Sequence, residues 1–203
     1  MIYIDTANMH YRELNHSVRQ LCSRQSRSIV LDNVNGQRYI GNALKGDSHI
    51  TINGVPGNDL AVFMDGPSLI VNGNIQDAGA NTMNGGMLVV HGNAGDTLGY
   101  GMRGGEVYIR DNAGYRAGVH LKEYREQKPV IIIGKTAGAF LGEYMAGGII
   151  AVLNLENNPE PVGPYCGSGM HGGVIYIRGA KTLKAANGVR LGALDAADGR
   201  ILK

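Results

Sequence analysis

Residues 85–109 read GGMLVVHGNAGDTLGYGMRGGEVYI, and this stretch contains one complete unit of a repeat. A glycine pair precedes four strand-forming residues, a loop follows, and a second glycine pair introduces the next strand 19 residues later. The pattern restarts along most of the chain, at His49, Ser68, Met87, Glu106, Val130, Ile149 and Val174. The steps are 19, 19, 19, 24, 19 and 25 residues, so two of them carry short insertions. A fixed period of this length is typical of a solenoid.

Two positions in every unit are aliphatic. The second position contains Ile50, Leu69, Leu88, Val107, Ile131, Ile150 and Ile175, and the fourth contains Ile52, Val71, Val90, Ile109, Ile133, Val152 and Ile177. The third position varies freely, from Thr51 to Tyr108. Alternation with a period of two is what a strand with one buried face requires. The sequence therefore predicts parallel strands whose second and fourth residues point into a shared core.

Glycine marks the turns of the repeat, and 32 of the 203 residues are glycine. Pairs follow a recurrent methionine in the pattern Met-x-Gly-Gly, and further glycines lie in the middle of the unit. We predict that these glycines have a structural role, because sharp turns need backbone conformations that glycine adopts without strain. The predicted turn glycines are Gly85, Gly86, Gly99, Gly104, Gly105, Gly118, Gly142, Gly147, Gly148, Gly172 and Gly173. We expect no catalytic, cofactor-binding or metal-binding residue in this chain.

A unit with one clear strand and a second, weaker strand cannot bury its own apolar face, so consecutive units must stack. We predict an all-β fold, a single-stranded parallel β-helix of about seven coils, with residues 29–203 as its domain and a less regular coil at residues 29–46. Residues 1–28 are predicted to form a strand and helix cap. Helical spacing of Tyr11, Leu14, Val18 and Leu21 indicates an α-helix over residues 8–23. This helix either covers the open end of the coils or packs alongside them.

Three motifs that could carry chemistry have simpler explanations. The run from Gly99 to Gly104 matches the dinucleotide fingerprint G-x-G-x-x-G, but it leads into a strand where that fingerprint opens a helix, so we interpret it as a turn. Five methionines share one column, which indicates core packing rather than a copper site, because no His or Cys column accompanies them. Cys22 and Cys166 form no C-x-x-C motif and indicate neither a disulfide nor a zinc or iron–sulfur site.

Composition argues against several classes of partner. A net charge of +2, with no Trp and two Phe, does not favour nucleic acid. The chain has no run of 18 apolar residues and no signal peptide at its start, so we expect a cytoplasmic protein without membrane contact. Two insertions, at residues 119–129 and 154–165, are predicted to form surface loops that contact partners, and plain solvated loops are the alternative.

The stretches from Gly92 to Gly105 and from Gly142 to Gly148 resemble the GXGXG domain of glutamate synthase, and the similarity extends over roughly residues 50–190. The resemblance implies a right-handed β-helix. In that family, a glutaminase domain passes ammonia to an FMN-dependent synthase domain, which forms glutamate from 2-oxoglutarate, and the β-helix holds the two in place. The resemblance therefore implies a non-catalytic scaffold subunit of a glutamate synthase-like complex, without activity of its own.

The same resemblance implies particular partners. They are a glutaminase-type amidotransferase subunit and an FMN-dependent glutamate synthase subunit, which would carry the FMN and iron–sulfur groups, while this chain binds no cofactor. Similar repeats form one of the subunits of formylmethanofuran dehydrogenase, so a scaffold of that molybdenum or tungsten enzyme is the alternative. A homo-oligomer is a further alternative. An independent β-helix enzyme is disfavoured, because lyases and hydrolases of that shape place acidic residues on one outer wall, and no acidic column is seen here.

Overall fold

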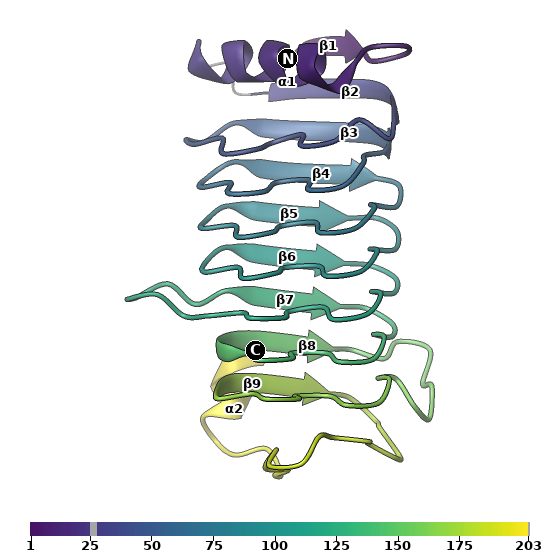
Figure 1. The fold of residues 1–203 in the computed structure, drawn as a ribbon, viewed down its shortest axis with the longest axis vertical. Coiled ribbons are helices and arrows are strands. Elements are labelled where there is room, and N and C mark those ends of the chain that lie inside the picture. The colour runs from purple at the N-terminus through teal and green to yellow at the C-terminus, as the bar shows by residue number, and fades with distance from the viewer. Residues whose placement is uncertain (25–27, 203) are drawn as a thin grey trace.

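The computed structural model describes residues 1–24 and 28–202, in which nine parallel strands form one sheet. The strands are hydrogen-bonded in chain order, and after each strand the chain returns to begin the next one below it (Figure 1). The architecture is an all-parallel β-solenoid. The strands are β1 (Ile2–Asp5), β2 (Ser28–Asn35), β3 (His49–Val55), β4 (Ser68–Asn72), β5 (Met87–Val90), β6 (Glu106–Ile109), β7 (Val130–Ile133), β8 (Ala146–Val152) and β9 (Gly172–Ile177).

The register of the sheet follows the period of the sequence. His49 pairs with Ser68, Ser68 with Met87 and Met87 with Glu106, and the pairing continues through Val130, Ile149 and Val174. The prediction that each unit begins at these residues is therefore confirmed. Their inward neighbours stack directly over one another and are at most 1% exposed from Ile50 to Ile150. These aliphatic ladders form one continuous core.

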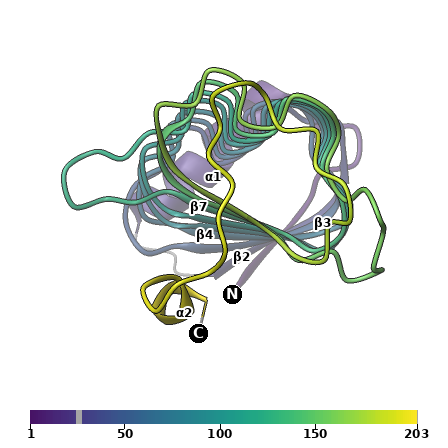
Figure 2. The same cartoon turned by 90° about the horizontal axis from the view of Figure 1, so that it is seen from below.

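The structure has about six regular turns, from β3 to β9, whereas the sequence predicted about seven. The prediction is too high because the residues after β9 form turns and a single bridge in place of another strand. The short helix α2 (Asp198–Ile201) then lies outside the sheet, where the hydroxyl of Tyr176 donates to Asp198 at 2.7 Å (Figure 2).

The second, weaker strand expected in each unit is reduced to single bridges. These bridges join Ile75, Ala94, Ala113, Ala137 and Val162. The extended segment at each bridge is short, because the residue three positions later has left-handed backbone, as Thr97 does (φ 56°).

The N-terminal end of the core is covered by β1 and by the helix α1 (Tyr11–Ser23) (Figure 1). The helix begins later than the predicted residue 8, because Asn8 has left-handed backbone (φ 62°) and His10 is the N-cap. Leu14 and Val18 are buried and belong to the same core as the aliphatic ladders. The helix therefore lies over the end of the solenoid and does not pack along a wall.

The two insertions form loops that project from opposite sides of the solenoid (Figure 2). In the first, the backbones of Tyr124 and Gln127 exchange two hydrogen bonds. In the second, the side chain of Asn154 is buried and is hydrogen-bonded to the backbone of Asn158 at both its oxygen and its nitrogen. Neither helix in the described ranges has the length and apolar character needed to cross a membrane.

Candidate functional site

Both glycines before a strand are crowded by the preceding coil, and the second also has left-handed backbone. A β-carbon on Gly104 would overlap the carbonyl oxygen of Asn84 in the preceding coil, and one on Gly147 would lie 2.6 Å from Glu123. The second glycine of each pair has left-handed backbone, with φ 81° at Gly105 and 88° at Gly148. A β-carbon on these second glycines would also lie 2.7 Å from the preceding coil, from Met83 at Gly105 and from Pro129 at Gly148. Both positions therefore disfavour a side chain, and the second also requires a conformation that glycine adopts readily.

The other predicted pairs have the same backbone conformations, with less crowding at the first glycine. A β-carbon would lie 2.9 Å from Asp65 at Gly85 and 3.1 Å from Ala146 at Gly172. The second glycines, Gly86 and Gly173, have φ 91° and 83°.

The mid-unit glycines Gly99, Gly118 and Gly142 share one column and have φ 67°, 71° and 67°. A β-carbon at Gly99 would lie 2.5 Å from the Cδ1 atom of Ile131, which belongs to the second strand further along. Gly118 and Gly142 are crowded in the same way by Ile150 and Ile175. Glycine in this column therefore leaves room for isoleucine in the core.

Each coil contains three left-handed residues at alternate positions, such as Thr97, Gly99 and Gly101. Their N–H groups point alternately along the solenoid axis: Thr97 donates to Tyr115 of the next coil, and Gly99 donates to Gly79 of the preceding one. This pattern occurs in residues 39–43, 59–63, 78–82, 97–101, 116–120, 140–144 and 165–169, which we call the GXGXG wall. The wall is hydrogen-bonded between coils like a sheet, although it contains no strands.

Aromatic residues are concentrated on the outer surface of the GXGXG wall. Six of the twelve Tyr and Phe residues of the chain belong to it, namely Tyr39, Phe63, Tyr100, Phe140, Tyr144 and Tyr165. Four of them, all except Tyr39 and Phe140, are exposed, and exposed Tyr115 lies directly beside the wall. Stacking of the coils therefore gathers aromatics that are scattered in the sequence onto one face.

One group of rings in the wall centres on His120. Its ring stacks on that of Tyr144 with centroids 5.2 Å apart, and it meets the edge of Tyr100 at 5.8 Å. Gly169 in the next coil allows this arrangement, because a β-carbon there would lie 2.5 Å from the Tyr144 ring. The three side chains come from three successive coils and form a short aromatic column.

A second column runs beside the first. The rings of Phe140 and Tyr165 stack at 4.9 Å, and the guanidinium carbon of Arg116 lies 5.2 Å from the Phe140 centroid. Arg116 also forms an ion pair with Glu143, in which Nε and Oε2 are 3.0 Å apart. The wall thus presents aromatic rings, an imidazole and a guanidinium in fixed positions, a composition that favours contact with another protein.

This surface was not predicted from the sequence. Aromatics are scarce in the chain as a whole, and His120 shares no column with other histidines. The signal was present in the residues on either side of each mid-unit glycine, which alternate between inward and outward positions. Of the residues in the GXGXG wall, only the mid-unit glycines had been assigned to a column.

Cys166 lies within the GXGXG wall next to Tyr165, but its side chain points inward and is buried. Burial raises the pKa of the Cys166 thiol to about 11, because the interior disfavours the charged thiolate. The thiol is therefore protonated at neutral pH and packs as a small apolar group. Among residues 1–24 and 28–202, no group of three or more His, Cys, Asp or Glu side chains is arranged to hold a metal ion.

Comparison with known families agrees with this geometry. The model of the GXGXG motif family matches residues 9–191, a range that contains α1 and the whole GXGXG wall. The chain therefore belongs to the GXGXG motif family, the type found at the C-terminus of glutamate synthase, and the resemblance seen in the sequence is confirmed. A relative from Methanocaldococcus jannaschii, described as "Uncharacterized protein MJ1350", is 55% identical over 185 residues, covering 88% of this chain and 71% of that protein.

Proposed function

We propose that this chain is a non-catalytic scaffold subunit of a glutamate synthase-like complex, an oxidoreductase of glutamate biosynthesis and nitrogen metabolism. The observation that carries the proposal is the family match over residues 9–191. The chain would hold together a glutaminase-type amidotransferase subunit and an FMN-dependent synthase subunit in the cytoplasm. These partners would carry the FMN and iron–sulfur groups. The coil of the scaffold itself would be right-handed, because connections between parallel strands of one sheet are nearly always right-handed.

The GXGXG wall is the surface we assign to partner binding. Tyr and Arg are enriched at protein interfaces and dominate their binding energies, and the wall exposes Tyr100, Tyr144, Tyr165 and Arg116. Hydrogen bonds between coils and stacking between rings hold these side chains in place. Little conformational entropy would therefore be lost when a partner binds.

Purification from native cells tests the proposed complex. A tagged copy of the chain is expected to capture a glutaminase-type chain and an FMN-binding chain, identified by mass spectrometry, with flavin absorbance in the eluate. Capture of chains that carry a pterin with molybdenum or tungsten would instead support the formylmethanofuran dehydrogenase alternative. Recovery of the tagged chain without either set of companions would contradict the scaffold role.

A pair of variants tests the binding surface. Tyr144→Ala removes a ring from the wall and should weaken capture of the partner by about tenfold or more, because central aromatic residues typically contribute 1–2 kcal/mol or more, which is about tenfold in affinity. Tyr124→Ala removes a similarly exposed ring from the first insertion and should leave capture unchanged. Thermal unfolding of both variants checks that the solenoid is intact. Loss of capture with Tyr124→Ala alone would assign the interface to the insertion.

A further inference from the structure

Arginine side chains gather where α1 meets the coil that follows β2. Arg12 and Arg19 lie on α1, and Arg38 lies in the turn after β2. The guanidinium carbons of Arg12 and Arg38 are 5.8 and 5.0 Å from the centroid of the same ring, that of Tyr11. In the described part of the chain, no ion pair includes any of these three arginines. The positive charges of Arg12 and Arg38 therefore lie against one ring without a carboxylate to balance them, and Arg19 lies two helical turns after Arg12 on the same helix.

Two clefts meet at Tyr11, which lines both of them. The smaller, of about 300 Å³, is cationic and is lined by Arg12, His16 and Arg19 from α1 and by Tyr39 and Asn42 from the GXGXG wall. In this cleft Arg19 donates to the carbonyl oxygen of Asn42 at 3.0 Å, which joins the helix to the first coil of the GXGXG wall.

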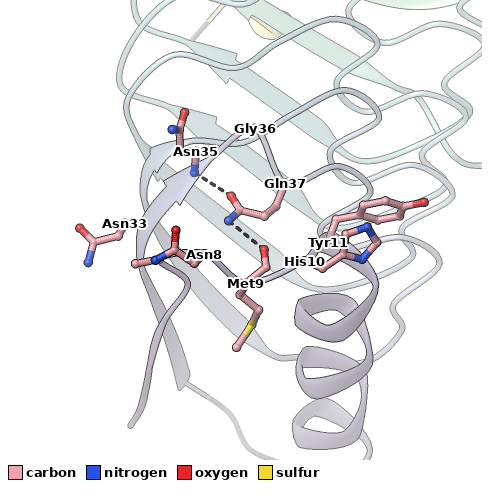
Figure 3. A pocket seen from close by; sticks show the side chains of 9 residues that line it. Asn8, Met9, His10, Tyr11, Asn33, Asn35, Gly36 and Gln37 are labelled. Carbon is pink, nitrogen blue, oxygen red and sulfur yellow. Dashed lines mark hydrogen bonds between the residues drawn. The ribbon is translucent and has the colours of Figure 1, made fainter.

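The larger cleft, of about 530 Å³, lies between the loop that precedes α1 and the turn after β2 (Figure 3). Gln37 holds its two sides together, since its side chain accepts from the N–H of Asn35 at 2.7 Å and donates to the carbonyl oxygen of Met9 at 3.4 Å. Side chains of Asn8, Asn33 and Asn35 line this cleft. The carboxamides of Asn8 and Asn35 make no hydrogen bond to the described residues, so they are free to bind a ligand.

The double cleft is electrically polarised. Beside the larger cleft, Oδ1 of Asp5 accepts from Asn33 Nδ2 at 2.9 Å and from the N–H of Ala7. At the arginine end, the hydrogen bond from Arg12 lowers the pKa of Tyr11, and the positive charges of Arg12 and Arg38 act in the same direction. A ligand that fits both ends therefore has an anionic group at the arginines and a neutral, hydrogen-bonding part at the asparagines.

We propose that this double cleft binds a sugar phosphate. The phosphate would lie in the smaller cleft, against Arg12 and Arg19, which line it, and within reach of Arg38, whose guanidinium lies over the Tyr11 ring. The planar guanidinium groups match phosphate oxygens in geometry and charge. The sugar would lie in the larger cleft, because carboxamides both donate and accept, as hydroxyl groups do. The carboxylate of Asp5 would repel a second phosphate, so the ligand is a monophosphate. This binding activity is independent of the scaffold role and of the aromatic columns.

Isothermal titration calorimetry on the full chain tests the proposal with three probes: ribose 5-phosphate, inorganic phosphate and ribose. Ribose 5-phosphate should bind about tenfold more tightly than inorganic phosphate, because it also contacts the asparagines, and ribose should bind most weakly. Arg38→Gln and Arg19→Gln should each weaken binding of both phosphates by about tenfold. Asn35→Leu should weaken ribose 5-phosphate and leave inorganic phosphate unchanged.

Arg103→Gln is the matched control, since Arg103 is an exposed arginine in another coil. It should leave all three affinities unchanged. Arg38→Lys keeps the charge and loses the planar fork, so it should bind more tightly than Arg38→Gln and less tightly than the natural chain. The proposal is overturned if ribose 5-phosphate gives no saturable heat up to about 10 mM, or if Arg103→Gln weakens binding as much as Arg38→Gln. Unfolding curves must show that each variant is folded.

Discussion

At the scale of single residues, a wall glycine and a core isoleucine depend on each other. Ala61 and Ala80 occupy the same column as Gly99 with φ 61° and 57°, so alanine is compatible with the backbone there. The obstacle at Gly99 is the Cδ1 atom of Ile131. The equivalent core position, in the second strand further along the chain, is a leucine for Ala61 and a valine for Ala80. For Gly99, Gly118 and Gly142 it is an isoleucine. Glycine is thus needed where isoleucine occupies the core position.

This coupling predicts a compensating pair of substitutions. We expect Gly99→Ala to lower the free energy of unfolding by about 2 kcal/mol, because the added methyl group overpacks the core. Ile131→Val removes the obstructing carbon, so the double variant should lose less than the sum of the two single losses, by about 1 kcal/mol. Urea unfolding of the four proteins gives the coupling. Strict additivity would show that the left-handed backbone, and not the contact, makes glycine necessary.

The buried thiol of Cys166 predicts a dependence on pH. An unfolded thiol has a pKa of about 8.5, whereas that of Cys166 is raised to about 11 by burial. The unfolded chain therefore releases this proton first as pH rises, so the contribution of Cys166 to stability is complete below about pH 8.5 and is lost as pH approaches 11. Comparing urea unfolding at pH 8 and pH 10 for the natural chain and Cys166→Ala isolates this effect.

Reaction with iodoacetamide provides a direct check on the same thiol. Cys22, which is only partly buried, should be alkylated in the folded protein well before Cys166. Equal rates for the two cysteines at pH 8 would contradict the burial of Cys166.

At the scale of elements, α1 covers the N-terminal end of the core, where no further coil is stacked. Its apolar residues contact the end of the aliphatic ladders, and without it the first rungs would be exposed. The helix also supplies two of the three arginines of the double cleft. Capping of the solenoid and formation of this candidate binding site are therefore properties of the same helix.

Truncation of a buried side chain in α1 should show how much the cap contributes. Leu14 is fully buried, so we expect Leu14→Ala to lower the free energy of unfolding by about 3 kcal/mol. Glu13→Ala, at the exposed neighbouring position, should change it by less than about 0.5 kcal/mol. Chemical denaturation of both variants provides the measurement. A small effect of Leu14→Ala would mean that the solenoid is stable without its cap.

At the scale of the whole molecule, stacked coils make the rod modular. Residues 68–86 form one complete unit of 19 residues, and their removal would bring β3 next to β5 with His49 opposite Met87. Gly41 in the wall would then face Leu88 in place of Leu69, which is the same residue type. We expect this deletion to fold, because repeat proteins are stabilised mainly by contacts between adjacent units.

A deletion of the wrong length provides the control. Removal of residues 68–77 leaves part of a unit, so the columns can no longer stack, and we expect an aggregated or unfolded chain. Circular dichroism and thermal melting distinguish the two outcomes. If both deletions unfold, the coils do not behave as interchangeable units.

The pattern of aliphatic residues was sufficient to predict the stacking order and the register, because every rung from Ile50 to Ile175 repeats the same alternation. It was insufficient at the two ends of the rod. The cap begins at Tyr11 because His10 caps the helix, and the last coil ends because the residues after Ile177 no longer follow the period. Neither boundary is repeated elsewhere in the chain, so no column indicated it.

The sequence by itself determined the solenoid, since a strict period brings chemically alike residues into contact wherever the coils stack. Only the tertiary structure decided what the surface presents. Tyr100, His120 and Tyr144 meet although they lie 20 and 24 residues apart in the chain, and Arg38 reaches Tyr11 because the helix crosses the end of the rod. Burial restricts inward positions to a few residue types, so these positions can be recognised as columns in the sequence. Outward side chains are free to vary, and which of them become neighbours depends on how each coil stacks on the next.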